Sequence, residues 1–415
     1  MEATELNILF LNAYYEPEQI SFTHLERDLL SRLVEQGHRI HIVCPTPTRG
    51  ISKETAKRYA KIKEETLYNG MVSVRRFRAP QEKRNPIVRA LRYFWCNWRT
   101  CRIGKKYKDI DVVFAVSTPP TQGYVAGKVA KKLKCPLVYS LQDIFPDSLV
   151  TTGLTSEGSL LWKIGRKIEK KTYKRCDKII VISNSCKQNL LNKGEDEGKI
   201  ALIPNWVNVE KVRPVSKEQN ALYQELGIDL GKFTVVYAGN LGEAQGADVI
   251  IRTAERLQAE TNVQFVIFGS GVQYEEARRT IEEKGLNNII IHPILPQERV
   301  SEVYSLGDVA LIVCKKGVGT SGMPSKTWSI MACNTSIISA FDEDSDLANL
   351  LKETGGGVCV EPENASALAE AIIQAKTNRE NGALTSNARS YVEENASSKV
   401  CAQRYIDVLE EATKK

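Results

Sequence analysis

The sequence KKGVGTSGMPSKTWSIMACNT, residues 315–335, is the most informative stretch of this 415-residue chain. It follows an apolar run at 309–314, contains three glycines, and passes through a Pro-Ser-Lys triplet ending at Lys326 into a helical pattern at 327–333. Glycines let a backbone approach a ligand closely, and a helix start offers unpaired N–H groups that suit a phosphate. An ordinary strand–loop–helix connection has the same pattern, so the stretch alone leaves both interpretations open.

Apolar runs of strand length alternate with helical patterns along the chain. In the first half we predict strands at 6–11, 39–43, 72–77, 112–116, 137–141, 178–182 and 200–203, with a helix at 23–36. The pattern restarts after a polar segment at 208–229, with strands at 233–238, 263–268, 289–291, 309–314, 336–338 and 357–360 and helices at 246–259, 274–284, 365–375 and 398–412. Such alternation predicts parallel sheets covered on both faces. We therefore predict an α/β fold of two doubly wound, Rossmann-like domains with a ligand-binding cleft between them.

Composition narrows the class of protein. A length of 415 residues favours two domains, and 42% hydrophobic residues is typical of a globular protein. No apolar run reaches the ~18 residues of a membrane span, and the acidic start does not resemble a signal peptide. The ten cysteines are scattered without a Cys-x-x-Cys pair, which favours a reducing cytoplasm over disulfides or a zinc site.

Charge is divided unevenly along the chain. Residues 1–200 carry a net charge of +15 and residues 201–415 a net charge of −8, which together give +7. Such a division predicts a negatively charged partner for the first half, either nucleic acid or an anionic membrane surface.

Three polar, glycine-bearing loops follow strands of the second half. They are 237–246 (YAGNLGEAQG), 268–271 (FGSG) and 317–326, and the carboxyl ends of parallel strands bring such loops to one edge. This arrangement predicts a nucleotide site. The loops match neither a P-loop nor the Gly-x-Gly-x-x-Gly fingerprint that would indicate a nicotinamide cofactor.

The order of motifs resembles family 4 glycosyltransferases, which have the GT-B fold, over nearly the whole chain. The motifs are YYEPE (14–18), LVEQGHR (33–39), DKIIVIS (177–183), IPNWVN (203–208), YAGN (237–240), FGSG (268–271) and PSK (324–326). Within the family, 239–246 together with 324–326 is most similar to bacterial N-acetylfucosaminyltransferases of capsule, O-antigen and exopolysaccharide pathways. The resemblance implies an acceptor-binding, membrane-facing domain at 1–207, a nucleotide-sugar domain at 208–390, and a helix within 391–415 that returns to the first domain.

The resemblance also implies a donor site for a UDP-sugar with no metal and no further cofactor. Its expected residues are Gly239, Asn240, Gln245, Gly269, Ser270, Ser321, Gly322, Ser325, Lys326 and Ser329. The family usually has two glutamates where this chain has Ser321 and Ser329, and an Arg and a Lys where it has Asn240 and Gln245. We therefore expect Lys326 to carry the phosphate charge. The pair Asp109 and Asp111 resembles a metal-binding Asp-x-Asp, but it precedes a strand, where aspartates usually form turns.

In addition to Lys326, two carboxylates of the first domain are candidates for catalysis. Asp143 follows the strand at 137–141, within LQDIFPD, and is our first choice to orient or deprotonate the acceptor hydroxyl. Glu18 lies on the loop after the first strand. The alternative for each is a turn or cap carboxylate with no part in the chemistry.

Residues 83–108 contain nine Lys or Arg and no acid. A basic helix with aromatic residues suits an anionic membrane interface, and the expected contact residues are Arg89, Arg92, Trp95, Trp98 and Arg99. The alternatives are a domain-packing helix with a solvated basic edge and a single-stranded nucleic-acid site, for which no supporting motif is present.

We thus expect a retaining, metal-independent hexosyltransferase at the inner face of the cell membrane. It would transfer an N-acetylated amino sugar from a UDP-sugar to an undecaprenyl-diphosphate-linked saccharide, in surface polysaccharide biosynthesis, and would not bind nucleic acid. Two alternatives remain: a UDP-sugar epimerase of the same fold, and a non-catalytic nucleotide-sugar-binding subunit of a polysaccharide assembly complex.

Overall fold

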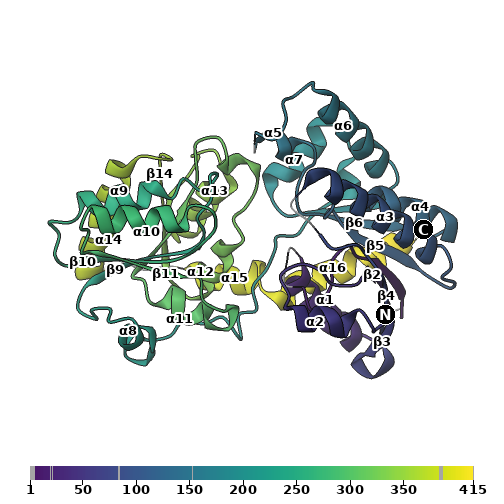
Figure 1. Cartoon of the computed structure of the whole chain (residues 1–415), viewed down its shortest axis with the longest axis horizontal. Coiled ribbons are helices and arrows are strands. Elements are labelled where there is room, and N and C mark those ends of the chain that lie inside the picture. The colour runs from purple at the N-terminus through teal and green to yellow at the C-terminus, as the bar shows by residue number, and fades with distance from the viewer. Residues whose placement is uncertain are drawn as a thin grey trace. The chain divides into compact units, whose positions relative to one another are not determined.

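A computed structural model of the chain describes residues 5–18, 20, 22–82, 85–151, 153–382 and 387–414 (Figure 1). The chain forms two compact units. The first comprises Met1–Pro204 together with Ser398–Lys415, and the second comprises Asn205–Ser397. Both are α/β units with doubly wound parallel sheets, so the predicted fold class is confirmed.

The sheet of the first unit has eight strands in the order β3-β4-β2-β1-β5-β6-β7-β8. Seven of them are parallel: β1 (Asn7–Leu11), β2 (Arg39–Pro45), β4 (Val72–Phe77), β5 (Val112–Val116), β6 (Leu137–Leu141), β7 (Lys178–Val181) and β8 (Ile200–Leu202). The eighth, β3 (Glu64–Leu67), is an antiparallel edge strand that the sequence did not predict. Its sequence, EETL, lacks an apolar run because an edge strand needs little burial.

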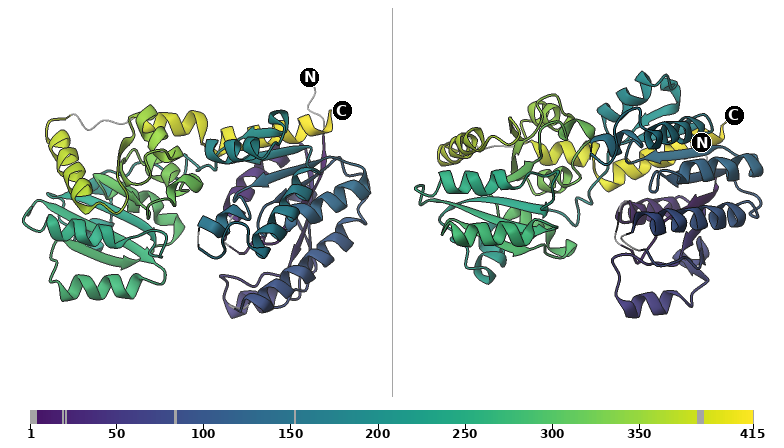
Figure 2. Two further views of the ribbon diagram at one scale, coloured as in Figure 1. Left: turned by 90° about the horizontal axis from the view of Figure 1, so that it is seen from above. Right: turned by 45° about the horizontal axis from the view of Figure 1, so that its top comes forward.

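Helices cover both faces of this sheet (Figure 2). On one face lie α1 (Thr23–Glu35) and α16 (Ser398–Thr413), which contact each other. The other face carries α3 (Pro86–Gly104), α4 (Gln122–Leu133), α6 (Leu160–Tyr173) and α7 (Asn184–Asn192), whose apolar residues join one core cluster with those of the sheet. Two short helices, α2 (Lys53–Tyr59) and α5 (Asp147–Thr151), complete the unit.

The sheet of the second unit is wholly parallel, in the order β11-β10-β9-β12-β13-β14. Its strands are β9 (Phe233–Asn240), β10 (Val263–Ser270), β11 (Ile289–Pro293), β12 (Val309–Val313), β13 (Ser336–Ala340) and β14 (Gly357–Val360). Strands β9 and β10 each continue two residues beyond the predicted ends at 238 and 268. The cause is backbone pairing that extends to Gly239 with Gly269 and Asn240 with Ser270.

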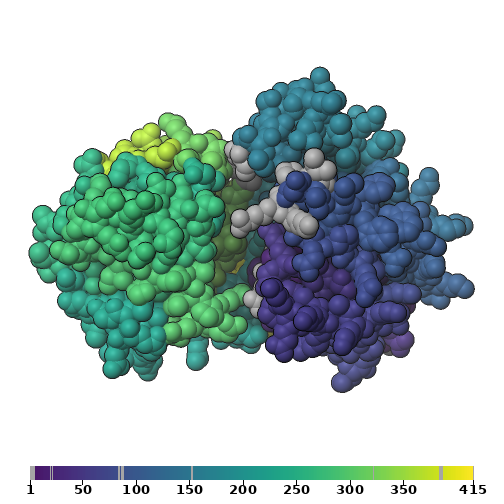
Figure 3. All heavy atoms as spheres, viewed as in Figure 1, coloured from purple at the N-terminus to yellow at the C-terminus, as the bar shows by residue number. Residues whose placement is uncertain are grey.

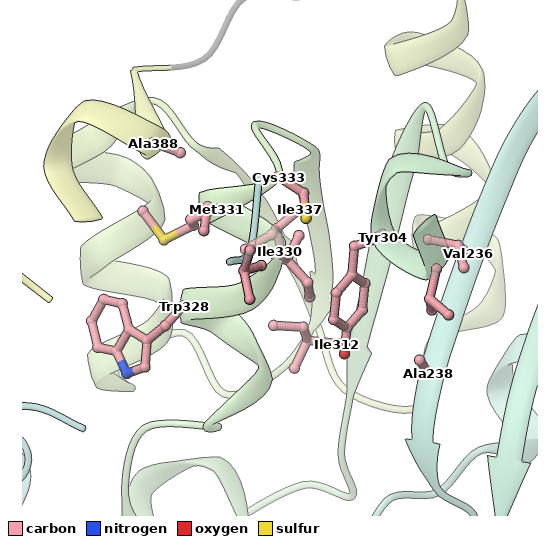
Figure 4. Packing of buried hydrophobic residues seen from close by; sticks show 14 of the residues in the cluster. Val236, Ala238, Tyr304, Ile312, Trp328, Ile330, Met331, Cys333, Ile337 and Ala388 are labelled. Atoms are coloured by element: carbon pink, nitrogen blue, oxygen red, sulfur yellow. The ribbon is translucent and has the colours of Figure 1, made fainter. Parts of the chain in front are cut away.

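One face of the second sheet is covered by α9 (Asp248–Arg256), α10 (Tyr274–Glu283) and α14 (Ala365–Glu380). The other face carries α8 (Leu222–Glu225), α11 (Val300–Ser305), α12 (Lys326–Ala332), α13 (Asp346–Thr354) and α15 (Ala388–Asn395). Figure 4 shows Trp328, Ile330 and Met331 of α12 within this core cluster, together with Ile337 and Tyr304. This packing fixes α12, and with it the position of Lys326 in its first turn.

The return of the chain to the first unit starts later than the predicted boundary at 391. Helix α15 contacts α12, and its Ala388 and Val392 lie in the core cluster of the second unit. The return therefore begins at Ser398. In α16 the hydroxyl of Tyr405 forms a hydrogen bond with Ser140 of β6, at 2.9 Å, inside the first unit.

Candidate functional site

The loops after β9 and β10 are bound to each other at the carboxyl edge of the second sheet. The Leu241 N–H donates to the Ser270 carbonyl at 2.5 Å, and the Gln273 N–H donates to the Leu241 carbonyl at 3.0 Å. Gly271 has a φ of +120°, and a Cβ there would lie 2.3 Å from Asn240 Oδ1. A glycine is therefore required where the two loops meet.

The third loop is tied to the same edge by Asp342, which follows β13. Its carboxylate accepts hydrogen bonds from the Gly317 N–H at 2.9 Å and the Gly319 N–H at 2.8 Å. The Lys315 N–H donates to the Ala244 carbonyl of the β9 loop at 3.0 Å. All three glycine-bearing loops thus meet at one edge, as predicted. The sequence did not predict a role for Asp342, whose only signal is an acid shortly after an apolar strand.

Lys326, the first residue of α12, lies where these loops meet. Its Nζ is 4.3 Å from the centroid of the Tyr237 ring, and a Cβ added to Gly239 would lie 2.5 Å from Nζ. The Tyr237 hydroxyl donates to the Asn240 carbonyl at 2.8 Å, which holds the ring in place. Among the described residues, no carboxylate lies within salt-bridge distance of this ammonium.

The surroundings of Lys326 desolvate its ammonium. The residue as a whole is half-buried, and desolvation lowers the pKa of the ammonium to about 8. A cation that is desolvated and not neutralised by a protein carboxylate gains free energy from an anionic ligand. Lys326 can therefore hold an anion at the edge of the sheet.

The two neutral residues Asn240 and Gln245, both expected in the donor site, contact each other. Asn240 Nδ2 donates to Gln245 Oε1 at 3.1 Å across the β9 loop, and Asn240 is exposed. Nearby, Glu243 pairs with Lys315 at 3.3 Å. Asn240 and Gln245 bring no charge to this edge. Among the residues expected in the donor site, Lys326 is therefore the one that supplies a positive charge.

The remaining expected donor residues lie on the same loops. Gly269 and Ser270 end β10, and a Cβ at Gly269 would lie 2.5 Å from Leu241 Cδ1. Ser325 is exposed and precedes α12, where its side chain makes no capping hydrogen bond, and Ser329 is half-buried one turn later. Gly322 has a φ of +153° in the loop. The side chain of Ser321 lies outside the described part of the structure.

In the first unit, Asp143 lies at the carboxyl end of β6. Its N–H donates to Ser117 Oγ at 3.3 Å, which holds the loop after β6 against the loop after β5. The side chain is exposed beside a small cavity that Glu169 and Tyr173 also line. Desolvation raises the pKa of the Asp143 carboxyl, and its exposure to solvent limits the effect. Asp143 is therefore accessible to a ligand.

Glu18 is fully buried. Its Oε1 accepts hydrogen bonds from the Thr48 and Arg49 N–H groups, each at 2.8 Å, and Oε2 has no hydrogen-bond partner among the described residues. Desolvation raises the pKa of this carboxyl. These contacts give Glu18 a structural role in holding the loop after β2, and its burial does not support a catalytic contact with substrate.

A buried pair that the sequence did not predict lies at the end of β1. Glu26 of α1 accepts a hydrogen bond from Asn12 Nδ2, both side chains are buried, and Asn12 Oδ1 has no partner among the described residues. They line a small cavity with Thr23 and Thr118. Desolvation raises the pKa of Glu26 to about 8. The available signal was spacing, because Glu26 lies four residues before Leu30, on the apolar stripe of the helix.

Asp111 has a structural partner. Its Oδ2 accepts a hydrogen bond from the Asn7 N–H at 2.7 Å, where β1 and β5 begin side by side. Asp109 has a φ of +56°, a conformation that aspartate tolerates in turns. Both residues therefore fit the turn that the sequence indicated.

The predicted aromatic face of α3 is exposed. Its large residues in contact with solvent are Leu91, Phe94, Trp95 and Trp98, and the rings of Trp95 and Trp98 lie 5.3 Å apart. Arg89 is exposed as well. The opposite side of α3 packs into the core through Cys96 and Ile103.

Arg92 was wrongly assigned to the membrane-contact residues. It is 2% exposed, its Nε donates to the Pro80 carbonyl at 3.0 Å, and a second nitrogen donates to Thr48 Oγ1 at 3.0 Å. Arg99 is half-buried, with its guanidinium 5.9 Å from the centroid of the Phe77 ring. The helical pattern alone does not show that the Arg92 side chain bonds to Pro80 and Thr48, which lie outside α3. Among the described residues, no helix is long and apolar enough to span a membrane.

Comparison with known families shows which family the chain belongs to. The family model described as Glycosyltransferase Family 4 matches residues 26–211, and the model described as Glycosyl transferases group 1 matches residues 218–398. The chain belongs to glycosyltransferase family 4. One match covers most of the first unit and the other covers most of the second unit. The family that the sequence motifs resemble is thereby confirmed.

Individual relatives are distant from this family 4 glycosyltransferase. It is 28% identical over 251 residues to the putative colanic acid biosynthesis glycosyl transferase WcaI of Escherichia coli strain K12, covering 60% of this chain and 61% of WcaI. It is 33% identical over 143 residues to alpha-galactosylglucosyldiacylglycerol synthase of Streptococcus pneumoniae, covering 34% of this chain and 38% of that protein. The match thus spans about three fifths of the length of WcaI.

Among solved structures, Anabaena Alr3699/HepE in complex with UDP superposes with a TM-score of 0.71. The sequences are 15% identical, and the superposition covers 98% of this chain and all of HepE. At that identity the similarity shows the fold, and GT-B-like architecture extends over the whole glycosyltransferase.

Proposed function

We propose that this family 4 glycosyltransferase transfers an N-acetylated amino sugar from a UDP-sugar to an undecaprenyl-diphosphate-linked saccharide, in surface polysaccharide biosynthesis. The observation that carries the proposal is Lys326, a desolvated cation at the meeting point of three glycine-bearing loops. The structural neighbour HepE was solved with UDP, and the relative WcaI is named for colanic acid biosynthesis. Both names support a UDP-sugar donor and a polysaccharide product.

The donor's diphosphate would lie against Lys326. Gly239 has no side chain, and this leaves space beside the ammonium that any Cβ would fill. Asn240, Gln245 and Ser329 would offer neutral hydrogen bonds to the ribose and sugar hydroxyl groups. When the bond between the anomeric carbon and the diphosphate breaks, negative charge grows on the leaving oxygen. Lys326 would stabilise that charge as a fixed cation, and no metal is required for that role.

The acceptor would bind to the first unit. There Asp143 is the accessible carboxylate that would orient the acceptor hydroxyl, or take its proton as the new glycosidic bond forms. The proposed stereochemistry is retention, as the family resemblance implies. A lipid-linked acceptor is supported by the S. pneumoniae relative, whose name specifies a glycosylated diacylglycerol. The exposed aromatic face of α3 would hold the enzyme at the inner face of the membrane.

The test is a panel of nucleotide sugars in two assays. Thermal shift should show stabilisation by UDP and UDP-N-acetylhexosamines and none by GDP- or dTDP-sugars, because a ligand at ~100 times its Kd adds about 2.7 kcal/mol. UDP release should then require a lipid-linked saccharide acceptor. Selective binding of another nucleotide would overturn the donor. Binding without UDP release would favour the non-catalytic subunit, and interconversion of the UDP-sugar without acceptor would favour the epimerase.

A further inference from the structure

Three neighbouring helices of the first unit present a cationic surface. Helix α4 contacts both α3 and α6, so the three form one layer over a face of the sheet (Figure 1). Together they contain twelve Lys and Arg, of which Arg92 is buried, and a single acid, Glu169. Glu169 is 5% exposed and pairs with Arg166 and Lys193, so it contributes almost no negative surface. In the space-filling view these helices belong to the blue-to-teal surface of the first unit (Figure 3).

The segment before helix α6 and the first turns of the helix add an exposed aliphatic group to this layer. We call it the α6 tip: Leu154, Leu160, Leu161 and Ile164, which are 72%, 76%, 50% and 49% exposed. Four large aliphatic side chains within eleven residues form a patch of the kind that marks an interaction surface. The α6 tip is separate in sequence from the aromatic face of α3, and the predicted site residues do not include it.

The α6 tip belongs to an ordered element. Ser159 caps the helix by accepting a hydrogen bond from the Trp162 N–H at 3.2 Å. On the buried side, a Cβ added to Gly165 would lie 2.7 Å from Pro146 Cβ, so the helix lies close against the loop after β6. The aliphatic residues therefore face solvent because the other side of the helix is packed.

Lysines follow the tip along the exposed side of the same helix and just beyond its end. Those in contact with solvent are Lys163, Lys167, Lys170, Lys171 and Lys174. From 153 to 174 the acids are Glu157, which is exposed, and the buried Glu169. In a symmetric dimer formed through this surface the lysines of the two copies would oppose each other, and between residues 153 and 174 the one exposed acid is Glu157. Nucleic acid would satisfy the lysines and leave the leucines in water.

We propose that the α6 tip inserts into the interfacial region of an anionic membrane while the lysines of α6 contact lipid headgroups. An aliphatic tip beside a row of cations matches the layered chemistry of such a surface, with acyl chains beneath negative headgroups. This gives the enzyme a second membrane contact beside α3, and the inference rests on the membrane location proposed above. Two contacts on helices joined through α4 would fix the orientation of the first unit on the bilayer.

The experiment measures binding of the full chain to vesicles of phosphatidylglycerol and phosphatidylcholine, and to vesicles of phosphatidylcholine alone. The tip variant is Leu160→Ser with Leu161→Ser and Ile164→Ser. The matched control is Leu230→Ser with Val358→Ser, two exposed aliphatics of the second unit that lie outside the donor loops. We expect the tip variant to bind anionic vesicles at least about tenfold more weakly and the control to bind like wild type. Thermal unfolding and UDP affinity should be unchanged in both.

A third variant, Trp95→Ser with Trp98→Ser, separates this inference from the proposed function. If the tip variant binds like wild type while the α3 variant is impaired, the α6 inference is wrong and the membrane location stands. If wild type ignores anionic vesicles at low salt, both are wrong. Self-association or RNA binding that the tip variant abolishes, without vesicle binding by wild type, would assign this surface to another partner and overturn the inference.

Discussion

The ammonium of Lys326 lies 4.3 Å from the centre of the Tyr237 ring, in the position that a side chain at Gly239 would otherwise occupy. The ring offers a cation–π contact, but it does not neutralise the charge as a carboxylate would. The protein therefore keeps a cation whose charge is only partly compensated until a ligand arrives. The effect of Lys326 on stability can therefore be measured in the free protein, and its effects on UDP affinity and proton uptake can be measured on binding.

Replacing Lys326 with Met should change affinity and stability in opposite directions. Affinity for UDP should fall about tenfold or more, because a hydrogen bond to a charged phosphate is lost. The free protein should become more stable at pH 7 by an amount of order 1 kcal/mol, because Met removes a desolvated charge from a half-buried site. Calorimetry and thermal unfolding measure the two effects. Lys316→Met, an exposed lysine of the same loop, should change neither, and unchanged UDP affinity in Lys326→Met would remove Lys326 from the donor site.

UDP binding should be accompanied by proton uptake near pH 8. The pKa of Lys326 is lowered from 10.5 to about 8 by desolvation, so about half of the free protein has a neutral amine at pH 8. An anionic diphosphate favours the charged form and raises this pKa. Calorimetry in buffers of different ionisation enthalpy should show uptake of about half a proton at pH 8 and less at pH 7. The uptake should be absent in Lys326→Met, and uptake that persists there must come from another group.

Glu26→Gln should stabilise the protein at alkaline pH. The pKa of Glu26 is raised from 4.5 to about 8, mainly by desolvation and further by Glu16. Between these values the native state holds a proton that the unfolded chain has released, so stability falls as pH rises from 4.5 to 8. Each unit of that separation is worth about 1.4 kcal/mol, so the total is a few kcal/mol.

Glutamine keeps an oxygen that can accept the hydrogen bond from Asn12 Nδ2 and cannot ionise. The variant and wild type should therefore unfold at similar denaturant concentrations at pH 5. At pH 8 the variant should be clearly the more stable of the two. A constant difference across this range would mean that Glu26 does not titrate there.

Asp143→Asn should lower turnover far more than donor affinity. If Asp143 acts on the acceptor hydroxyl, the loss of general-base catalysis should reduce kcat by roughly 10²–10⁴-fold while UDP affinity stays unchanged. Steady-state kinetics and calorimetry separate the two quantities. Asp109→Asn is the control, because Asn also tolerates the φ of +56° at that turn. Near-normal turnover in Asp143→Asn would make this residue a structural loop carboxylate.

The strands of both sheets could be predicted because each is an apolar run with clear boundaries. The exception was β3, whose EETL sequence has no apolar pattern, since it pairs at the edge by its backbone. The meeting of the three donor loops could also be predicted, because parallel strands deliver their loops to one edge. The hydrogen bonds from the third loop to Asp342 could not be predicted, because Asp342 lies 25 residues from Gly317 in the sequence.

The acidic residues of the first unit show the limit of a one-dimensional pattern. Glu18, on a predicted loop, was expected to be accessible, and the loop after β2 covers it completely. Glu26, on a predicted helix, was not considered although its spacing places it on the buried stripe. Whether a carboxylate is covered depends on elements distant in the sequence, whereas the side of a helix on which it lies can be read locally.

The placement of α16 has a consequence for synthesis of the chain. Tyr405 packs 6.0 Å from the Phe22 ring and 6.1 Å from the Phe114 ring, and it bonds to Ser140 of β6. On a ribosome, Ser140 emerges 265 residues before Tyr405, and Phe114 and Phe22 emerge earlier still. Part of the sheet face that α1 leaves uncovered must therefore remain exposed while the whole second unit is translated. A chaperone that shields apolar surface during that interval should raise the yield of native enzyme.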